Sequence, residues 1–203
     1  MPKRIQSLPI DPKWNLPVPW FVQWINGKPE FPVMDGKKWV KAVSDKLCWI
    51  CGKPINGPMA FVIGPMCGIN RTSAEPPSDL QCALYAAQTC PFLVTPKMKR
   101  MDVDHLGTVD APGIALKRNP GCCAVWITKS YDIIHAPNGP LIRIGEPQQI
   151  HWFAEGRKAT RDEIMESIES GLPFLQNIAR EDGPDAEAEL VRMTKVLERL
   201  LPR

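Results

Sequence analysis

Apolar and polar positions change their period along the chain, and this change separates predicted strands from predicted helices. Short apolar runs bounded by Pro, Gly and Asn are typical of strands. Residues 20–33, "WFVQWINGKPEFPV", read as a hairpin with Asn26-Gly27 at the turn. "AFVIGPM", from Ala60 to Met66, reads as a further strand, and residues 121–155 contain several more around a second hairpin signal, Asn138-Gly139. These hairpins predict antiparallel pairing.

Helical periodicity appears after residue 77 and again towards the C-terminus. Residues 78–90, "SDLQCALYAAQTC", begin with Ser78 as the expected N-cap and are followed by Pro91, which should end the helix. In "KATRDEIMESIESG", Thr160 and Glu163 have the spacing of a capping box, and Gly171 should end that helix. A last amphipathic helix is expected over about residues 184–201.

Composition and charge add moderate constraints. The chain has 203 residues with 44% hydrophobic and 23% charged residues, which is typical of globular proteins, but its 22 prolines favour many turns. The net charge of +3 is unevenly distributed. Residues 1–58 carry nine Lys/Arg against four Asp/Glu, whereas residues 160–203 carry six against ten. A basic N-terminal part is compatible with a nucleic-acid partner.

Neither a secretory signal nor a membrane span is evident in the sequence. "MPKRIQSLPI" starts basic, but no apolar segment follows it, and no apolar run approaches 18 residues. We therefore expect a cytoplasmic protein that makes no membrane contact. In a reducing compartment, seven cysteines that cluster in sequence indicate metal ligands or catalytic thiols before disulfides.

Two cysteine positions predict a zinc site. Cys48 and Cys51, followed by Gly52, have the form of a zinc knuckle, in which two thiolates from one tight turn bind one ion. Asp79 and Cys82 lie three residues apart at the start of the helix predicted for residues 78–90, so both side chains can reach the same ion. Knuckle, hairpin and helix N-terminus together resemble the layout of a treble clef. Glycines and prolines directly after Cys51 oppose the helix that a redox Cys-x-x-Cys requires, and simple burial of free cysteines remains the alternative.

The sequence does not decide which residue is the fourth zinc ligand. Asp79 is the first candidate, although structural zinc sites prefer Cys and His. Cys67 follows the strand at residues 60–66 and is one rival. Cys90 is the other, but it lies roughly 12 Å beyond Cys82 if the helix is unbroken. Whether zinc is structural or catalytic depends on this position, because a catalytic ion keeps one site for water.

Polar residues gather beside the cysteines in "GINRTSAEPPS". Asn70, Arg71 and Ser73 are candidate ligand-binding residues, and Arg71 could bind a phosphate or a carboxylate. Glu75 and Arg71 are candidate catalytic residues if a metal-bound water lies nearby. The alternative is that these side chains satisfy the backbone of a loop.

Two further features of the sequence bear on nucleic-acid cleavage or binding. Asp104-His105 invites comparison with His-Asn-His nucleases, but His135 and His151 lie in or beside predicted strands instead of on a following helix. Trp14, Trp20, Trp24 and Trp39 lie among lysines, a pattern that suits base stacking. The alternative is that large aromatics near prolines hold loops onto a core.

Several segments together resemble a family of uncharacterised proteins from bacteria and their phages. They are "VPWFVQWINGKPEF", "LCWICGKPI", "AFVIGPMCGINRTSAEPPS", "CPFL" and "WFAEGRKATRDEIMESIESGLPFL", and the likeness runs over most of residues 15–175. In that family the helix pair tends to read His-x-x-Cys, with Asp79 at the histidine position here. The resemblance implies zinc and a cytoplasmic location, and it implies no particular chemistry.

These observations combine into one expected architecture and three expected functions. We expect an α+β fold in one compact domain, residues 1–203, with small antiparallel sheets. Its parts are a treble-clef-like zinc module at about 46–96, a strand-rich part at about 121–155 and C-terminal helices at about 158–201. The leading function is a zinc-stabilised protein of phage or prophage type that acts by binding nucleic acid or a protein partner, and the sequence leaves open whether it is an enzyme. The alternatives are a metal-dependent enzyme, nuclease- or hydrolase-like, that uses residues 67–75, and a small inhibitor of a host protein.

Overall fold

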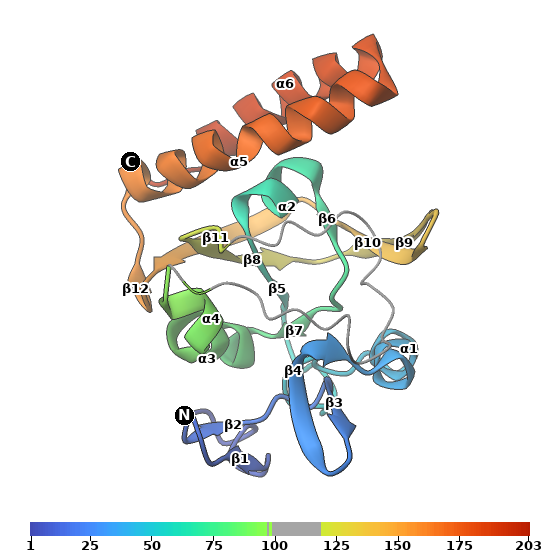
Figure 1. Cartoon of the computed structure of the whole chain (residues 1–203), viewed down its shortest axis with the longest axis vertical. Coiled ribbons are helices and arrows are strands. Elements are labelled where there is room, and N and C mark those ends of the chain that lie inside the picture. Colours follow the sequence, from blue (N-terminus) through green and yellow to red (C-terminus); the bar gives the residue numbers. More distant parts are fainter. Residues whose placement is uncertain (97, 99–118) are drawn as a thin grey trace.

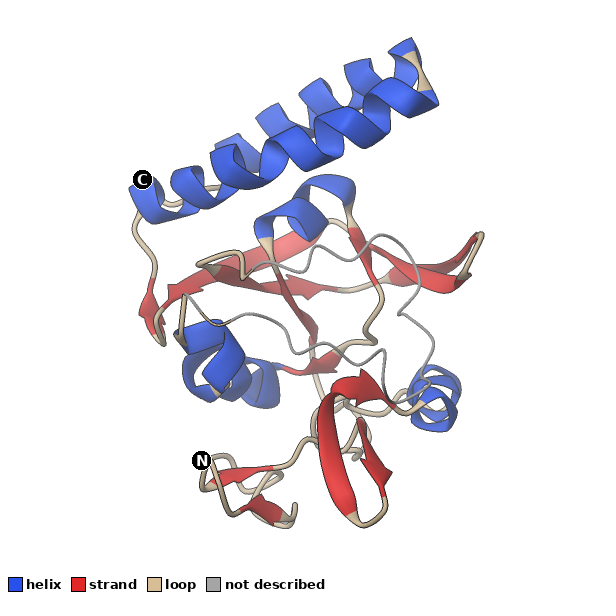
Figure 2. Cartoon of the chain, in the orientation of Figure 1, coloured by secondary structure: helices blue, strands red, loops and turns tan. Residues whose placement is uncertain are grey.

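Helices and antiparallel sheets both contribute to the fold, so the α+β expectation is confirmed. The structure is a computed structural model, and it describes residues 1–96, 98 and 119–203. Figure 1 shows the order of the elements, and Figure 2 shows strands in the middle of the molecule with helices on either side. Among the described residues, every pair of neighbouring strands is antiparallel.

The N-terminal part consists of two small ribbons and one helix. β1 (Ile10–Asp11) pairs with β2 (Leu16–Pro17), and β3 (Val22–Ile25) pairs with β4 (Lys28–Met34). Asn26 and Gly27 both have positive φ, 51° and 76°, which confirms the predicted hairpin turn. Asp35 then caps α1 (Gly36–Ser44) by accepting from the N–H groups of Lys37 and Lys38.

A five-stranded sheet forms the centre of the fold, in the order β12-β11-β8-β5-β7. Its strands are β5 (Met59–Ile63), β7 (Ser78–Asp79), β8 (Cys123–Thr128), β11 (Pro147–Ala154) and β12 (Arg157–Lys158). Every residue of β8 is buried, as its apolar sequence requires of a central strand covered on both faces. Cys122, directly before β8, belongs to the core on one face and Cys123 to the core on the other, because consecutive residues of an extended chain point to opposite faces.

A second sheet, in the order β6-β10-β9, continues from the first. β9 (Tyr131–Ala136) and β10 (Gly139–Ile144) form the hairpin predicted at Asn138-Gly139, and β6 (Thr72–Ser73) pairs with β10. β8 and β11 lead directly into this hairpin through a bend. At the bend, the Thr128 hydroxyl donates to the carbonyl oxygens of Ser130 (3.2 Å) and Glu146 (2.9 Å).

Helices cover both faces of the five-stranded sheet. α3 (Leu80–Thr89) and α4 (Pro91–Val94) lie on one side, where Ala83 and Ala87 pack against Val125. α2 (Pro65–Asn70), α5 (Arg161–Asp182) and α6 (Pro184–Arg199) lie on the other side, as Figure 1 shows. Their core includes Trp126, Ile164 and Leu197. None of the helices in the described part of the chain has the length and apolarity that crossing a bilayer requires.

Two predicted helix boundaries need correction. The capping box of Thr160 and Glu163 is present, but α5 continues through Gly171 and Pro173 to Asp182. The longer helix buries Leu175 and Ala179 in the core, and this packing outweighs the unfavourable propensities of glycine and proline. At α3, the N-cap is Asp79 and not Ser78.

Candidate metal centre

The knuckle of Cys48 and Cys51 is a tight backbone hairpin that directs both thiols to one side. Gly52 N–H donates to the Cys48 carbonyl oxygen (2.8 Å), and Cys48 N–H donates to the carbonyl oxygen of Lys53 (2.8 Å). Leu47 and Pro54 form an antiparallel bridge below the turn. Gly52 has a φ of +70°, a conformation that L side chains rarely adopt. A Cβ there would also lie 2.6 Å from Trp20 Cγ, so glycine is required on two counts.

Cys82 completes a group of three thiols. It lies in the first turn of α3, and the sulfur atoms of Cys48, Cys51 and Cys82 all lie within 4.8 Å of one another. The three side chains are buried, with exposed fractions of 0%, 5% and 0%. The Asp79 N–H donates to Cys48 Sγ (3.2 Å), which ties the start of α3 to the knuckle. This arrangement can hold a metal ion.

Asp79 does not belong to this group of ligand atoms, because its carboxylate is already engaged. Oδ1 accepts from Gln81 N–H (3.2 Å), as an N-cap does. Oδ2 pairs with Arg4 Nη1 at 3.1 Å, and Arg4 Nη2 also donates to the Pro54 carbonyl oxygen. The N-terminal segment therefore reaches the metal centre, with Ile5 buried against the cysteines.

The two rival fourth ligands lie elsewhere. Cys67 is in α2 and packs against the core shared with α5 and α6. Burial, with a smaller effect of Glu75, raises the pKa of the Cys67 thiol to about 11. Cys90 is the C-cap of α3, and burial raises its pKa as well. Neither is part of the three-thiol group that the described residues contain.

Hydrogen bonds among the three clustered thiols shift their pKa values in opposite directions. Those with Cys48 and then Cys82 lower the pKa of Cys51 far below its ordinary value, with a smaller contribution from Arg4. The hydrogen bond with Cys51 raises the pKa of Cys48, and those with Cys48 and then Cys51 raise the pKa of Cys82. One thiolate is thus stabilised and further ones are opposed, until a cation offsets their mutual repulsion.

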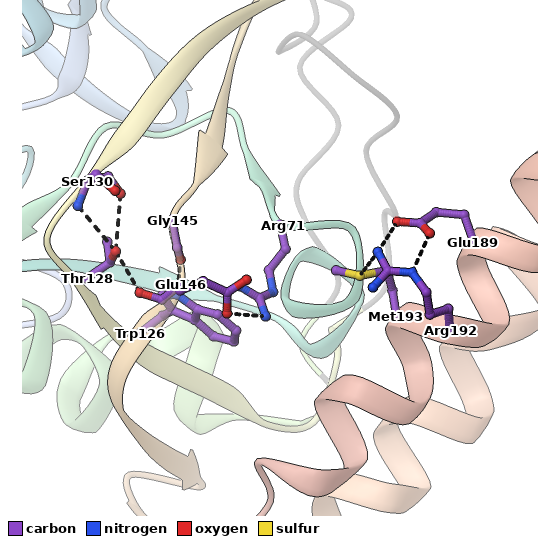
Figure 3. A network of polar contacts seen from close by, with 9 residues as sticks. All are labelled: Arg71, Trp126, Thr128, Ser130, Gly145, Glu146, Glu189, Arg192 and Met193. Carbon is purple, nitrogen blue, oxygen red and sulfur yellow. Dashed lines mark hydrogen bonds and ion pairs between the residues drawn. The ribbon is translucent and has the colours of Figure 1, made fainter.

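The polar segment at residues 67–75 faces a different part of the fold. Arg71 ends α2 with a φ of 54°, and its guanidinium lies 4.5 Å from the centroid of the Trp126 ring. Arg71 Nη2 pairs with Glu146 Oε2 at 3.1 Å, as Figure 3 shows beside the Thr128 bend. Asn70 is the exposed last residue of α2. Ser73 donates to the Glu75 carbonyl oxygen and accepts from the Glu75 N–H, both at 3.0 Å. This segment contains α2 and β6, whereas the sequence indicated an irregular loop.

The tryptophans of the N-terminal part divide into two pairs. Trp20 lies edge-on against buried Trp49, and Trp39 Nε1 donates to the Ala74 carbonyl oxygen (2.8 Å), so both hold the fold together. Trp14 and Trp24 are 41% and 42% exposed, and Phe31 is 38% exposed. Trp24 is paired with Pro29 across the ribbon, and the register of the two strands shifts next to Phe31, between the Gln23–Glu30 and Val22–Met34 pairs.

Exposed lysines lie on the same N-terminal elements as these rings and on α1. Lys13 Nζ lies 5.0 Å from the centroid of the Trp14 ring. Lys28 begins β4 beside the turn, and α1 presents Lys37 and Lys41 to solvent. We call the exposed side chains of Trp14, Trp24, Phe31 and these lysines the aromatic–basic face.

Comparison with known proteins identifies no relative: no family model, curated protein or solved structure matches the chain.

Asp104 and His105 lie outside the described residues. His135 and His151 lie in β9 and β11, as the sequence indicated. Arg4 is the residue at the metal centre that sequence reasoning missed, because it lies 75 positions from Asp79 and no local pattern marks it.

Proposed function

We propose that Cys48, Cys51 and Cys82 bind a zinc ion that stabilises this part of the fold, with one coordination position not supplied by these three residues. Three thiolates are soft ligands of the kind that structural zinc sites use. The sulfur atoms are buried and within 4.8 Å of one another. Arg4 and Asp79 form a 3.1 Å ion pair beside the thiols, with side chains that are 22% and 10% exposed. The site joins the N-terminal segment, the knuckle and α3, so the ion stabilises the base on which the aromatic–basic face is built.

We further propose that this face binds single-stranded nucleic acid. The single observation that carries the proposal is the exposure of Trp14 and Trp24 among lysines, on a segment whose other tryptophans are packed. Bases of any sequence stack on exposed aromatic rings, and lysines neutralise the phosphates between them. The net charge of +5 over residues 1–58 favours a negatively charged partner, as a nucleic acid is.

Metal analysis tests the first proposal. Protein purified without added zinc should contain about one equivalent, and Cys82→Ala should lose it because one of three thiolates is gone. Cys67→Ala and Cys90→Ala are matched controls that should retain zinc. Less than about half an equivalent in the wild type, together with a fold that resists a chelator, would contradict the zinc site.

Fluorescence anisotropy with labelled single-stranded oligonucleotides tests the second proposal. Trp14→Ala and Trp24→Ala should each weaken binding by about fivefold to a hundredfold, because a base–aromatic stack contributes roughly 1–3 kcal/mol. Phe174→Ala is the matched control, since Phe174 is 48% exposed but lies on α5, in the acidic part of the chain. Equal affinities for the wild type and both tryptophan variants would exclude this face. If the protein co-purified from a host lysate with a host protein and without nucleic acid, the result would instead favour the inhibitor function.

The enzyme alternative is not favoured by the observed contacts. Arg71 is engaged by Trp126 and Glu146, and none of its hydrogen bonds or ion pairs joins it to the cysteines. We therefore propose a binding protein and not a catalyst.

A further inference from the structure

The C-terminal helices form a groove on their surface that the proposed function does not use. α5 and α6 lie side by side across the fold (Figure 1), and their inner residues Ile164, Ile168 and Leu197 pack into the core. A groove of about 390 Å³ lies between the two helices. Leu172 of α5 and Leu190 and Thr194 of α6 are among its lining residues.

Val191 stands in this groove with a charge on either side. Val191 is 55% exposed, whereas Leu190 and Leu197 of the same helix are buried. Glu187 precedes it by four residues and Lys195 follows it by four, and both also line the groove. Residues four apart lie on one face of a helix, so the order along this face is acidic, apolar and basic.

This order is complementary to itself when one copy is reversed. In an antiparallel pair of identical helices related by a two-fold axis, a residue four positions before the centre faces the residue four positions after it. With Val191 at the centre, Glu187 of each copy would face Lys195 of the other copy, which gives two pairs. A parallel pair in register would instead place like charges opposite each other.

We propose that α6 docks against α6 of a second copy of this chain, antiparallel and centred on Val191. Each Val191 covers the groove between the helices of the other copy, and each Glu187 pairs with the partner's Lys195. The four helices then form a bundle with α6 and the partner's α6 at its centre. This inference is independent of zinc and of nucleic acid.

The charges of α6 support a second copy as the occupant. Glu189 and Arg192, on the neighbouring face, already pair within the chain at 2.6 Å (Figure 3). In the described part of the chain, Glu187 and Lys195 have no ion-pair partner. Two unpaired charges of opposite sign, spaced evenly about an exposed apolar residue, are complementary to their own reversed copy. An unrelated partner would not require that symmetry.

Charge reversal tests both the contact and its orientation. Sedimentation equilibrium at low salt should show a wild-type dimer. Glu187→Lys and Lys195→Glu should each raise the dissociation constant by about tenfold or more, because each creates two like-charge contacts. The double variant should return to within about threefold of the wild type, since the pairs are restored with reversed sign.

The control carries the same change on another face. Glu189→Lys should leave the dissociation constant unchanged, and circular dichroism should show that every variant is folded. A wild type that stays monomeric at the highest concentration reached would overturn the proposal. A dimer unaffected by both single reversals, or one that the double variant fails to restore, would overturn it equally.

Discussion

Replacing Gly52 with alanine tests whether Trp20 and the knuckle share their space as the structure indicates. The left-handed backbone at Gly52 would cost a non-glycine residue about 1–2 kcal/mol. The new methyl would also lie 2.6 Å from Trp20 Cγ. The backbone N–H of Trp20 donates a hydrogen bond to the Ile50 carbonyl oxygen, and its ring packs edge-on against Trp49, so the ring can move little to make room for a methyl group. Overpacking of this kind typically adds 1–3 kcal/mol, and the total loss of unfolding free energy should be about 2–5 kcal/mol.

A matched glycine separates the two contributions. Gly27 has a similar φ of +76°, but no atom lies within 4 Å of its added Cβ, so Gly27→Ala should lose only the backbone part. The assay is urea unfolding followed by circular dichroism at a fixed free zinc concentration, because bound metal shifts apparent stability. In a Trp20→Ala background, Gly52→Ala should lose only about 1–2 kcal/mol. Equal losses at Gly52 and Gly27 in the wild-type background would refute the steric argument.

Three further predictions concern the rest of the fold. Arg157, and then the Thr160 N–H, lower the pKa of Glu163 to about 2, so the stability that the Glu163 carboxylate contributes is present above its unfolded pKa of about 4.3 and is lost as pH falls towards 2. Glu163→Gln should therefore reduce the loss of unfolding free energy between pH 6 and pH 3 by about 1 kcal/mol. The same loss in the variant and the wild type would contradict this prediction. Gly145→Ala would place a Cβ 2.5 Å from the Ser130 carbonyl oxygen and should destabilise the β8–β11 bend by about 1–3 kcal/mol, whereas Gly64→Ala, with its nearest contact at 3.5 Å, is the control. Leu197→Ala should lose about 2–5 kcal/mol because the side chain is 1% exposed; an equal loss for Leu200→Ala, at 39%, would show that burial is not the cause.

Local chemistry explains which parts of the fold the sequence predicted. Asn26-Gly27 and Asn138-Gly139 mark hairpins because their residues accept the backbone angles of tight turns. The capping box of Thr160 and Glu163 is equally local, since its hydrogen bonds join residues three apart. Such features depend on neighbours in sequence, and they appear in the structure where expected.

Helix α5 shows where local chemistry is overruled. Gly171 and Pro173 both indicate an end, yet the helix continues for another nine residues beyond Pro173, to Asp182. The continuation is stabilised by contacts of Leu175 and Ala179 with residues distant in sequence. Helical stability in proteins comes mostly from such packing and not from propensity. No single stretch of sequence contains that information.

The metal centre combines both kinds of information. Cys48, Cys51 and Cys82 could be chosen from spacing, because a knuckle and the first turn of a helix each impose a fixed geometry on thiols. The role of Asp79 could not be chosen in that way, because it depends on Arg4 at the far end of the N-terminal segment.

Arg4 also bears on how a three-thiolate site is balanced electrostatically. Three thiolates and a zinc ion carry a net charge of −1, which is unfavourable where the sulfur atoms are buried. The Arg4 guanidinium contributes to the lowered pKa of Cys51 and pairs with Asp79, so one cation lies beside both a thiol and the carboxylate. Both Asp79 oxygens already have a partner, Arg4 at Oδ2 and the Gln81 N–H at Oδ1, so binding of Asp79 to the ion would compete with these contacts. The ion pair therefore favours a centre whose cation is bound by cysteines alone, with Arg4 stabilising them from outside the ligand set.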